Sequence, residues 1–133
     1  MTENTHILLI KEYLQALEDG EAGESLGRFF TDDAVQIELP NKLNPAGGQS
    51  DLATIKKRSE EGKKILKQQS YTIKSIVADG DNVAVEADWV GVLAISLANL
   101  PEGYEMKAHF AMFFEFANGG IAVQRNYDCF EPW

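Results

Sequence analysis

The first third of the chain shows the spacing of amphipathic helices. Apolar residues recur at intervals of three and four over residues 5–19, which predicts a helix whose apolar face carries Ile7, Ile10, Leu14 and Leu17. Tyr13 lies beside this stripe, Asn4 or Thr5 can cap the start of the helix, and Gly20 can end it. A second, shorter helix is predicted over residues 21–30.

A short strand, a loop and a third helix follow. The segment AVQIEL at 34–39 alternates between apolar and polar residues, which is typical of a half-buried strand, and residues 31–33 are expected to form a turn before it. The segment 40–49 holds two prolines and two glycines, which predicts a loop. Ser50 is expected to cap the third helix, and Gly62 is expected to let that helix pack closely.

The second half of the chain has the pattern of strands alone. Strands are predicted at about 70–79, 83–95, 105–117 and 121–130, and the joints between them read DGDN, ANLPEG and NGG. Helices and a short strand followed by a meander of strands predict an α+β fold with no repeat and no interdomain linker. We therefore expect residues 1–133 to form one domain.

The last hairpin can be predicted in more detail, because Asn118-Gly119 is a strong signal for a two-residue turn. Such a turn places Ala117 opposite Gly120 and, counting outward, His109 opposite Asp128. A turn at Gly119-Gly120 keeps His109 and Asp128 on one face, one diagonal step apart, whereas a three-residue loop places them on opposite faces.

The two faces of this hairpin differ in character. One face is apolar and holds Phe110, Met112, Phe114, Phe116, Ile121, Val123 and Tyr127. The other holds His109, Ala111, Phe113, Gln124, Asn126 and Asp128. One face is expected to meet the helices, and the other to meet water, a ligand or a second subunit. Alternation alone favours placing the more apolar face inward.

Composition and charge exclude several classes of function. The formal net charge of −9 disfavours binding to nucleic acids and to anionic membranes. The basic residues at 56–67 are interleaved with Glu60 and Glu61, which indicates a solvated helix face. The chain has one cysteine, Cys129, and no apolar run long enough for a signal or a membrane span, so we expect a cytoplasmic protein.

The arrangement of elements resembles the nuclear transport factor 2-like superfamily, and most closely its SnoaL-like polyketide cyclase and ketosteroid isomerase branch. The most telling segment is HFAMFFEFANGGIAVQRNYDCFEPW at 109–133, which is similar to the last hairpin of small SnoaL-like proteins. The resemblance implies a cone, in which a strongly curved, mostly antiparallel sheet wraps around three helices from the N-terminal half. It also implies a mostly apolar cavity between the sheet and the helices.

The resemblance also implies site residues. In the cyclases an Asp of the final strand acts as general acid and base with a nearby His, and Asp128 and His109 match these positions. Tyr13 lies on a helix matching the one that carries an oxyanion-hole Tyr in the isomerases. The base of the isomerases is an Asp just after the second helix, where this chain offers Glu38, Asp32 and Asp33 without a convincing match. Their second acidic donor has no clear match, because Trp89, Gly91 and Leu93 occupy the strand concerned.

Each candidate also has a purely structural interpretation. His109 and Asp128 can form a solvated cross-strand pair instead of a proton-transfer pair. The hydroxyl of Tyr13 can bind a backbone carbonyl instead of a ligand, and Trp89 can be a core residue instead of a cavity wall. Asn126 can position a ligand or lie at the surface. Glu38 is expected to be the polar side of its strand and Cys129 a small buried apolar residue.

The leading hypothesis is a cofactor-free acid–base enzyme that binds a small, largely apolar organic molecule. Asp128 would move the proton with His109 as its partner, while Tyr13, Trp89 and Asn126 would line the site, and no metal is expected. The loop at 40–49 would cover the mouth. The alternative is a non-catalytic ligand-binding or protein-interaction module on the same fold. A homodimer is expected, because helices can cover only one face of the curved sheet.

Overall fold

The computed structural model describes residues 4–133. Helices precede most of the strands along the chain. Their bounds are α1 Thr5–Glu18, α2 Glu24–Gly27, β1 Phe30–Glu38, β2 Gly48–Ser50, α3 Leu52–Ile65, β3 Leu66–Asp79, β4 Asn82–Leu93, β5 Glu105–Ala117 and β6 Gly120–Phe130. The predicted α+β class is confirmed, and β2 is an additional short strand inside the segment expected to be a loop.

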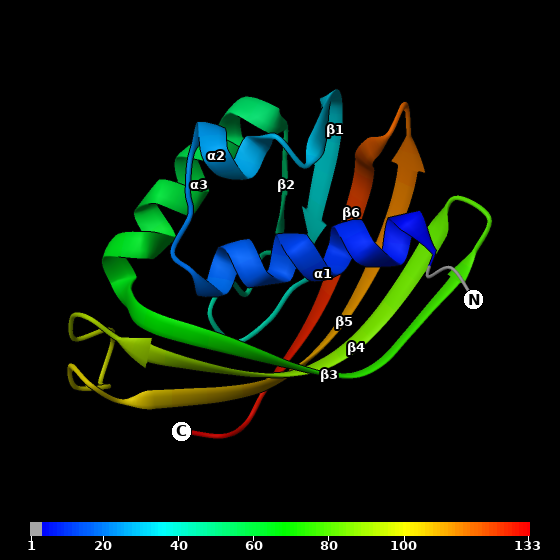
Figure 1. The fold of residues 1–133 in the computed structure, drawn as a ribbon. Helices are drawn as coiled ribbons and strands as arrows, with labels where there is room; N and C mark the ends of the chain where they lie inside the picture. The colour runs from blue at the N-terminus through cyan, green and yellow to red at the C-terminus, as the bar shows by residue number, and fades with distance from the viewer. Residues whose placement is uncertain (1–3) are drawn as a thin grey trace.

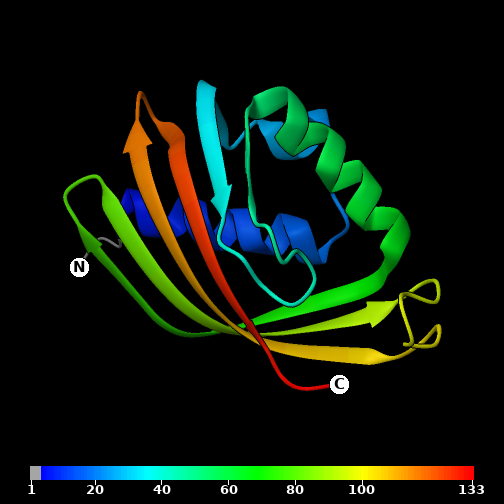
Figure 2. The same cartoon turned by 180° about the vertical axis from the view of Figure 1, so that it is seen from behind.

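All of these strands belong to one sheet, in the order β2-β1-β6-β5-β4-β3. Strands β1 and β6 are parallel, and every other neighbouring pair is antiparallel. The sheet is strongly curved, with α1 crossing its concave side and α3 lying next to α2 and β1 (Figures 1 and 2). Because β6 lies between β1 and β5, it runs through the middle of the sheet.

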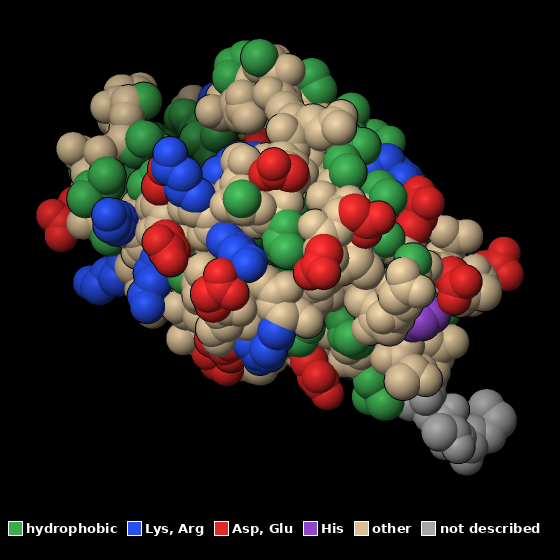
Figure 3. Space-filling view, turned by 90° about the horizontal axis from the view of Figure 1, so that it is seen from above, with side chains coloured by type: hydrophobic (Ala, Val, Ile, Leu, Met, Phe, Trp, Pro, Cys, Tyr) green, Lys and Arg blue, Asp and Glu red, His purple; other side chains and the backbone are tan. Residues whose placement is uncertain are grey.

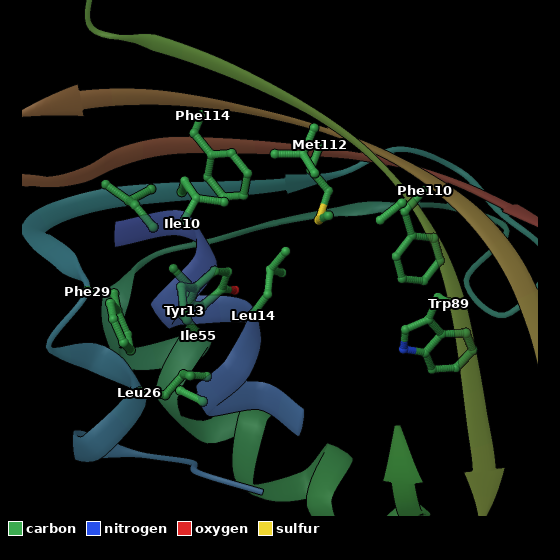
Figure 4. Packing of buried hydrophobic residues seen from close by; sticks show 14 of the residues in the cluster. Ile10, Tyr13, Leu14, Leu26, Phe29, Ile55, Trp89, Phe110, Met112 and Phe114 are labelled. Carbon is green, nitrogen blue, oxygen red and sulfur yellow. The ribbon is translucent and has the colours of Figure 1, made fainter. Parts of the chain in front are cut away.

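The core lies between the concave side of the sheet and the helices. Every second residue of β4 and β5 is buried, as expected for strands with one face covered. Ile10, Tyr13 and Leu14 of α1 face Met112 and Phe114 of β5 across this core (Figure 4). The apolar face of β5 is therefore the inner face, as alternation favours.

The predicted turn of the last hairpin is confirmed, but the register beyond it is wrong by one residue. Ala117 pairs with Gly120, and Phe116 with Ile121, but Glu115 then pairs with Val123. Ala122 is the extra residue of a β-bulge, which moves every later residue of β6 to the other face.

Several local predictions also need correction. Residues 31–33 belong to β1 instead of a turn, and Asp51, not Ser50, caps α3 by accepting from the amide of Thr54. A Cβ atom at Gly62 would meet no atom within 4 Å, so close packing does not require a glycine there. Cys129 is exposed instead of buried, because the bulge turns it outward.

The surface is charged with both signs. Acidic and basic side chains are interspersed over the face seen in Figure 3. Within the basic segment of α3, Lys56 pairs with Glu24 at 2.9 Å and Arg58 pairs with Glu38 at 2.7 Å. Among residues 4–133, no helix has the length and apolar character needed to cross a membrane.

Candidate active site

Asp128 is the central residue of the candidate site. The bulge places it on the concave face of β6, directly opposite Phe110 of β5. Its Oδ1 atom is buried and accepts no hydrogen bond from any residue between 4 and 133. Burial, together with the charge of Glu38, raises the pKa of Asp128 to about 6. Such a carboxyl group can take up or release a proton near neutral pH.

Aromatic rings surround this part of the concave face. Phe110 stacks on Trp89, with 5.3 Å between ring centroids, and Phe130 meets both rings edge-on. The ring centroid of Tyr71 of β3 lies 6.2 Å from that of Phe110. Burial raises the pKa of Tyr71 well above 10, and nearby negative charges, including that of Asp128, add to the shift. Asp128 therefore shares the concave face with flat apolar surfaces.

Trp89 is 5% exposed, so it belongs to the core as well as to this aromatic group. Its indole nitrogen donates to Gln69 Oε1 at 2.9 Å, and the hydroxyl of Tyr71 donates to the same oxygen. Gln69 also lines a groove of about 400 Å³ between the C-terminal ends of α1 and α3 and the start of β3.

A chain of side-chain hydrogen bonds connects α1, β1 and β6. The hydroxyl of Tyr13 donates to Gln124 Oε1 at 3.2 Å, so it bonds to a side-chain amide instead of a backbone carbonyl. Gln36 Nε2 donates to the same oxygen at 2.9 Å, and Gln124 Nε2 donates to Asn126 Oδ1 at 3.0 Å. Asn126 thus lies on the concave face with Asp128.

Glu38 forms a second polar cluster at the end of β1. Its carboxylate accepts from Arg58 of α3 and from Asn41 and Asn44 of the following loop. Burial opposes its ionisation, but these hydrogen bonds and the charge of Arg58 lower the pKa of Glu38. Glu38 therefore carries a stable negative charge on the strand next to Asp128 and ties down the loop that was expected to act as a flap.

His109 and Asp128 do not form the predicted pair. His109 lies opposite Cys129 on the outer face of the sheet, and its side chain is 56% exposed. Its Nδ1 atom lies 2.8 Å from Asp88 and its Nε2 atom 3.2 Å from Glu131. These contacts, chiefly the one with Asp88, raise the pKa of His109. The physical reason for the separation is the bulge at Ala122.

The sequence-based search missed Gln36, Tyr71 and Gln124 and gave Glu38 no role in the site. The signal for Gln36 and Glu38 was present, since both occupy the polar side of the first strand. What was missing is the parallel pairing of β1 with β6, which places Gln36 beside Gln124 and Glu38 beside Asn126. Among residues 4–133, no group of three or more acidic, His or Cys side chains is arranged to hold a metal ion.

Comparison with known proteins agrees with this architecture. No curated protein matches the sequence. The structure is similar to IdmH from Streptomyces antibioticus, named as a candidate polyketide cyclase, with a TM-score of 0.76 and 18% identity over 95% of this chain and 92% of that one.

Two other solved structures support the same fold. A phenazine biosynthesis-related protein, PhzB2 from Pseudomonas aeruginosa, has a TM-score of 0.72 and 17% identity over 93% of this chain and 79% of that one. An NTF2-like protein from Anabaena variabilis has a TM-score of 0.71 and 15% identity, with 100% and 96% of the two chains covered. Residues 10–124 match the SnoaL-like domain, so the chain belongs to the SnoaL-like family.

Proposed function

We propose that the protein binds a small, largely apolar organic molecule on the concave face and moves a proton on it without a cofactor. Asp128 acts as the general base and then as the acid. The observation that carries this proposal is its buried, unpartnered Oδ1 atom on a carboxyl group whose pKa is raised to about 6. The structurally similar IdmH is named as a candidate polyketide cyclase.

The surroundings of Asp128 support an apolar ligand with one polar group. Trp89, Phe110 and Phe130 offer flat surfaces for a planar or hydrocarbon body. We propose the groove lined by Gln69 as the approach to this aromatic group, since Gln69 accepts a hydrogen bond from the indole of Trp89. In this proposal His109 takes no part, because it lies on the other face of the sheet.

A non-catalytic ligand-binding module is the second candidate. The imidazole that was expected to share the proton of Asp128 is absent from the concave face, which favours binding without turnover. The two candidates predict different behaviour toward a carbon acid. A base at Asp128 removes a proton from the carbon next to a carbonyl group, forming an enolate, and returns a proton from solvent to the same carbon.

The test measures deuterium exchange at the carbons next to the carbonyl group of 2-tetralone, a small ketone fused to an aromatic ring, by proton NMR in D₂O. We expect the protein to accelerate exchange, and Asp128→Asn to reduce the accelerated rate by about 10²- to 10⁴-fold. Asp88→Asn is the matched control, because Asp88 is a partly exposed carboxylate on the outer face and pairs with His109.

Each outcome separates the candidates. No acceleration by the wild-type protein, combined with 2-tetralone binding in the same NMR samples, would support the binding module over the enzyme. Acceleration that survives Asp128→Asn would mean that another group is the base. A loss in Asp128→Asn with full activity in Asp88→Asn supports the proposed role.

A further inference from the structure

Gln124 is a polar side chain that the proposed proton transfer does not use. It is 2% exposed and lies on the concave face of β6, between α1 and β1. Its oxygen accepts from both Tyr13 and Gln36, and its nitrogen donates to Asn126. A buried amide with this number of partners holds one orientation, because an unmade hydrogen bond in the interior is costly.

The two hydrogen bonds that Gln124 Oε1 accepts determine which group of Gln124 faces Asn126. Because two donors point at Gln124 Oε1, the NH₂ group of Gln124 faces Asn126. Turning Gln124 over would bring its NH₂ group against the NH₂ group of Gln36, which lies 2.9 Å from the present oxygen position. With Gln124 in this orientation, Asn126 presents its oxygen to Gln124 and its own NH₂ group to the opposite side.

Tyr13 secures the start of this chain. Burial raises the pKa of Tyr13 to about 12, although the hydrogen bonds to Gln124 and Gln36 oppose the shift. Its hydroxyl therefore keeps its proton at any physiological pH and remains a donor to Gln124. Tyr13 therefore acts on Asn126 through Gln124.

The NH₂ group of Asn126 then lies on the same face as Asp128. The two residues are separated by one position on β6, so their side chains point the same way. Among residues 4–133, Nδ2 of Asn126 has no hydrogen-bond acceptor and Oδ1 of Asp128 has no donor. The concave face thus presents a hydrogen-bond donor, the NH₂ group of Asn126, next to the carboxyl group of Asp128.

We propose that Gln124 is a positioning residue that orients the amide of Asn126, so that Asn126 donates a hydrogen bond to an oxygen atom of the ligand bound beside Asp128. This inference rests on the proposed function for the ligand, and it specifies a ligand with a carbonyl oxygen. When Asp128 removes a proton from the neighbouring carbon, negative charge moves to that oxygen. A donor fixed beforehand stabilises this charge.

The first test needs no ligand. Side-chain hydrogen bonds give scalar couplings across the bond in NMR of a ¹³C,¹⁵N-labelled protein. We expect a coupling between Gln124 Nε2 and the carbonyl carbon of the Asn126 side chain. A coupling in the reverse direction, from Asn126 Nδ2 to the side-chain carbonyl carbon of Gln124, would overturn the proposal. This result is independent of whether the protein catalyses any reaction.

The second test uses the 2-tetralone exchange rate. Asn126→Asp keeps the acceptor for Gln124 and removes the NH₂ group, and we expect about a three- to tenfold lower kcat with little change in KM. Gln124→Glu removes the donor to Asn126, so the amide of Asn126 is expected to turn over and kcat to fall by a similar factor. Tyr13→Phe leaves Gln36 in place and is expected to have the smallest effect.

Gln49→Glu provides the matched control, since Gln49 is exposed on β2 and undergoes the same chemical change. Unchanged kcat in Asn126→Asp, in a protein that unfolds at the wild-type urea concentration, would overturn the proposal. If Gln124→Glu does not fold, the Asn126→Asp variant and the coupling measurement still decide it. Loss of activity in Asp128→Asn alone, without loss in Asn126→Asp, would keep the proposed function and reject the orienting role.

Discussion

Asp128 is the residue whose environment differs most from that of a surface carboxylate, and this difference affects the stability of the fold. In the unfolded chain an Asp has a pKa of about 3.9, whereas the native pKa of Asp128 is raised to about 6, chiefly by burial. The native state therefore holds the proton more tightly. The stability that this group contributes is present below about pH 4 and is lost as the pH rises through about 6.

Replacing Asp128 by Asn removes this dependence. A shift of about two pKa units corresponds to at most about 3 kcal/mol, which partial exposure to solvent reduces. We compare the unfolding free energy of Asp128→Asn with that of wild type at each pH. This difference should rise by up to about 3 kcal/mol when the pH is raised from 4 to 8. Urea unfolding at the two pH values measures the gain, and Asp88→Asn serves as the comparison. The same pH dependence in wild type and Asp128→Asn would show that the carboxyl group is well hydrated.

At the scale of elements, the last hairpin shows which structural features can be predicted from the sequence and which cannot. Asn118-Gly119 and the alternation of β5 predict the turn and the buried face correctly. The bulge at Ala122 cannot be recognised locally, because neither Ala122 nor its neighbours carry a turn or bulge signal. Because this one extra residue was not predicted, the sequence placed His109 opposite Asp128, whereas the structure has Phe110 there.

The parallel pairing of β1 and β6 is a second feature outside the reach of local patterns. It joins residues about 90 positions apart in the chain, such as Gln36 and Gln124. Alternation within each strand identifies which residues share a face, but not which strands are neighbours. The candidate carboxylate Asp128 and its neighbour Asn126 could thus be identified from the sequence, whereas the amide chain that links them to α1 could not.

Helix α3 offers a prediction about its own stability. Gly62 lies in the interior of this helix, and a Cβ atom added there would meet no atom within 4 Å. Ala loses less backbone entropy than Gly on folding, so Gly62→Ala should raise the free energy of unfolding by about 0.5–1 kcal/mol. Urea unfolding at constant pH measures the change.

Gly91 provides the opposite case for the same substitution. A Cβ atom at Gly91 would lie 2.2 Å from the ring of Trp89, so Gly91→Ala should destabilise the protein and disturb the aromatic group near Asp128.

For Gly62→Ala, a loss of stability would contradict the prediction and mean that α3 packs more closely than its contacts indicate.

At the scale of the whole molecule, the two faces of the curved sheet have different surroundings. The concave face packs on the helices and contains the candidate site, while the outer face is left uncovered by any element of residues 4–133 (Figures 1 and 2). Val77, Phe113 and Tyr127 on this outer face are 59%, 38% and 41% exposed. Val77, Ala84 and Phe113 are neighbours across β3, β4 and β5, and Phe113 meets Tyr127 edge-on at 5.6 Å.

We propose that this outer face joins two copies of the chain, since exposed aromatic and branched residues in a contiguous group favour association. Sedimentation at micromolar concentration should then give twice the chain mass of 14.7 kDa. Phe113→Lys should shift the protein to the monomer mass, because a charge would be buried at the interface without a partner. Ile95→Lys is the control, since Ile95 is also exposed, at 47%, but lies outside the sheet strands. A wild-type protein of 14.7 kDa under these conditions would contradict the dimer.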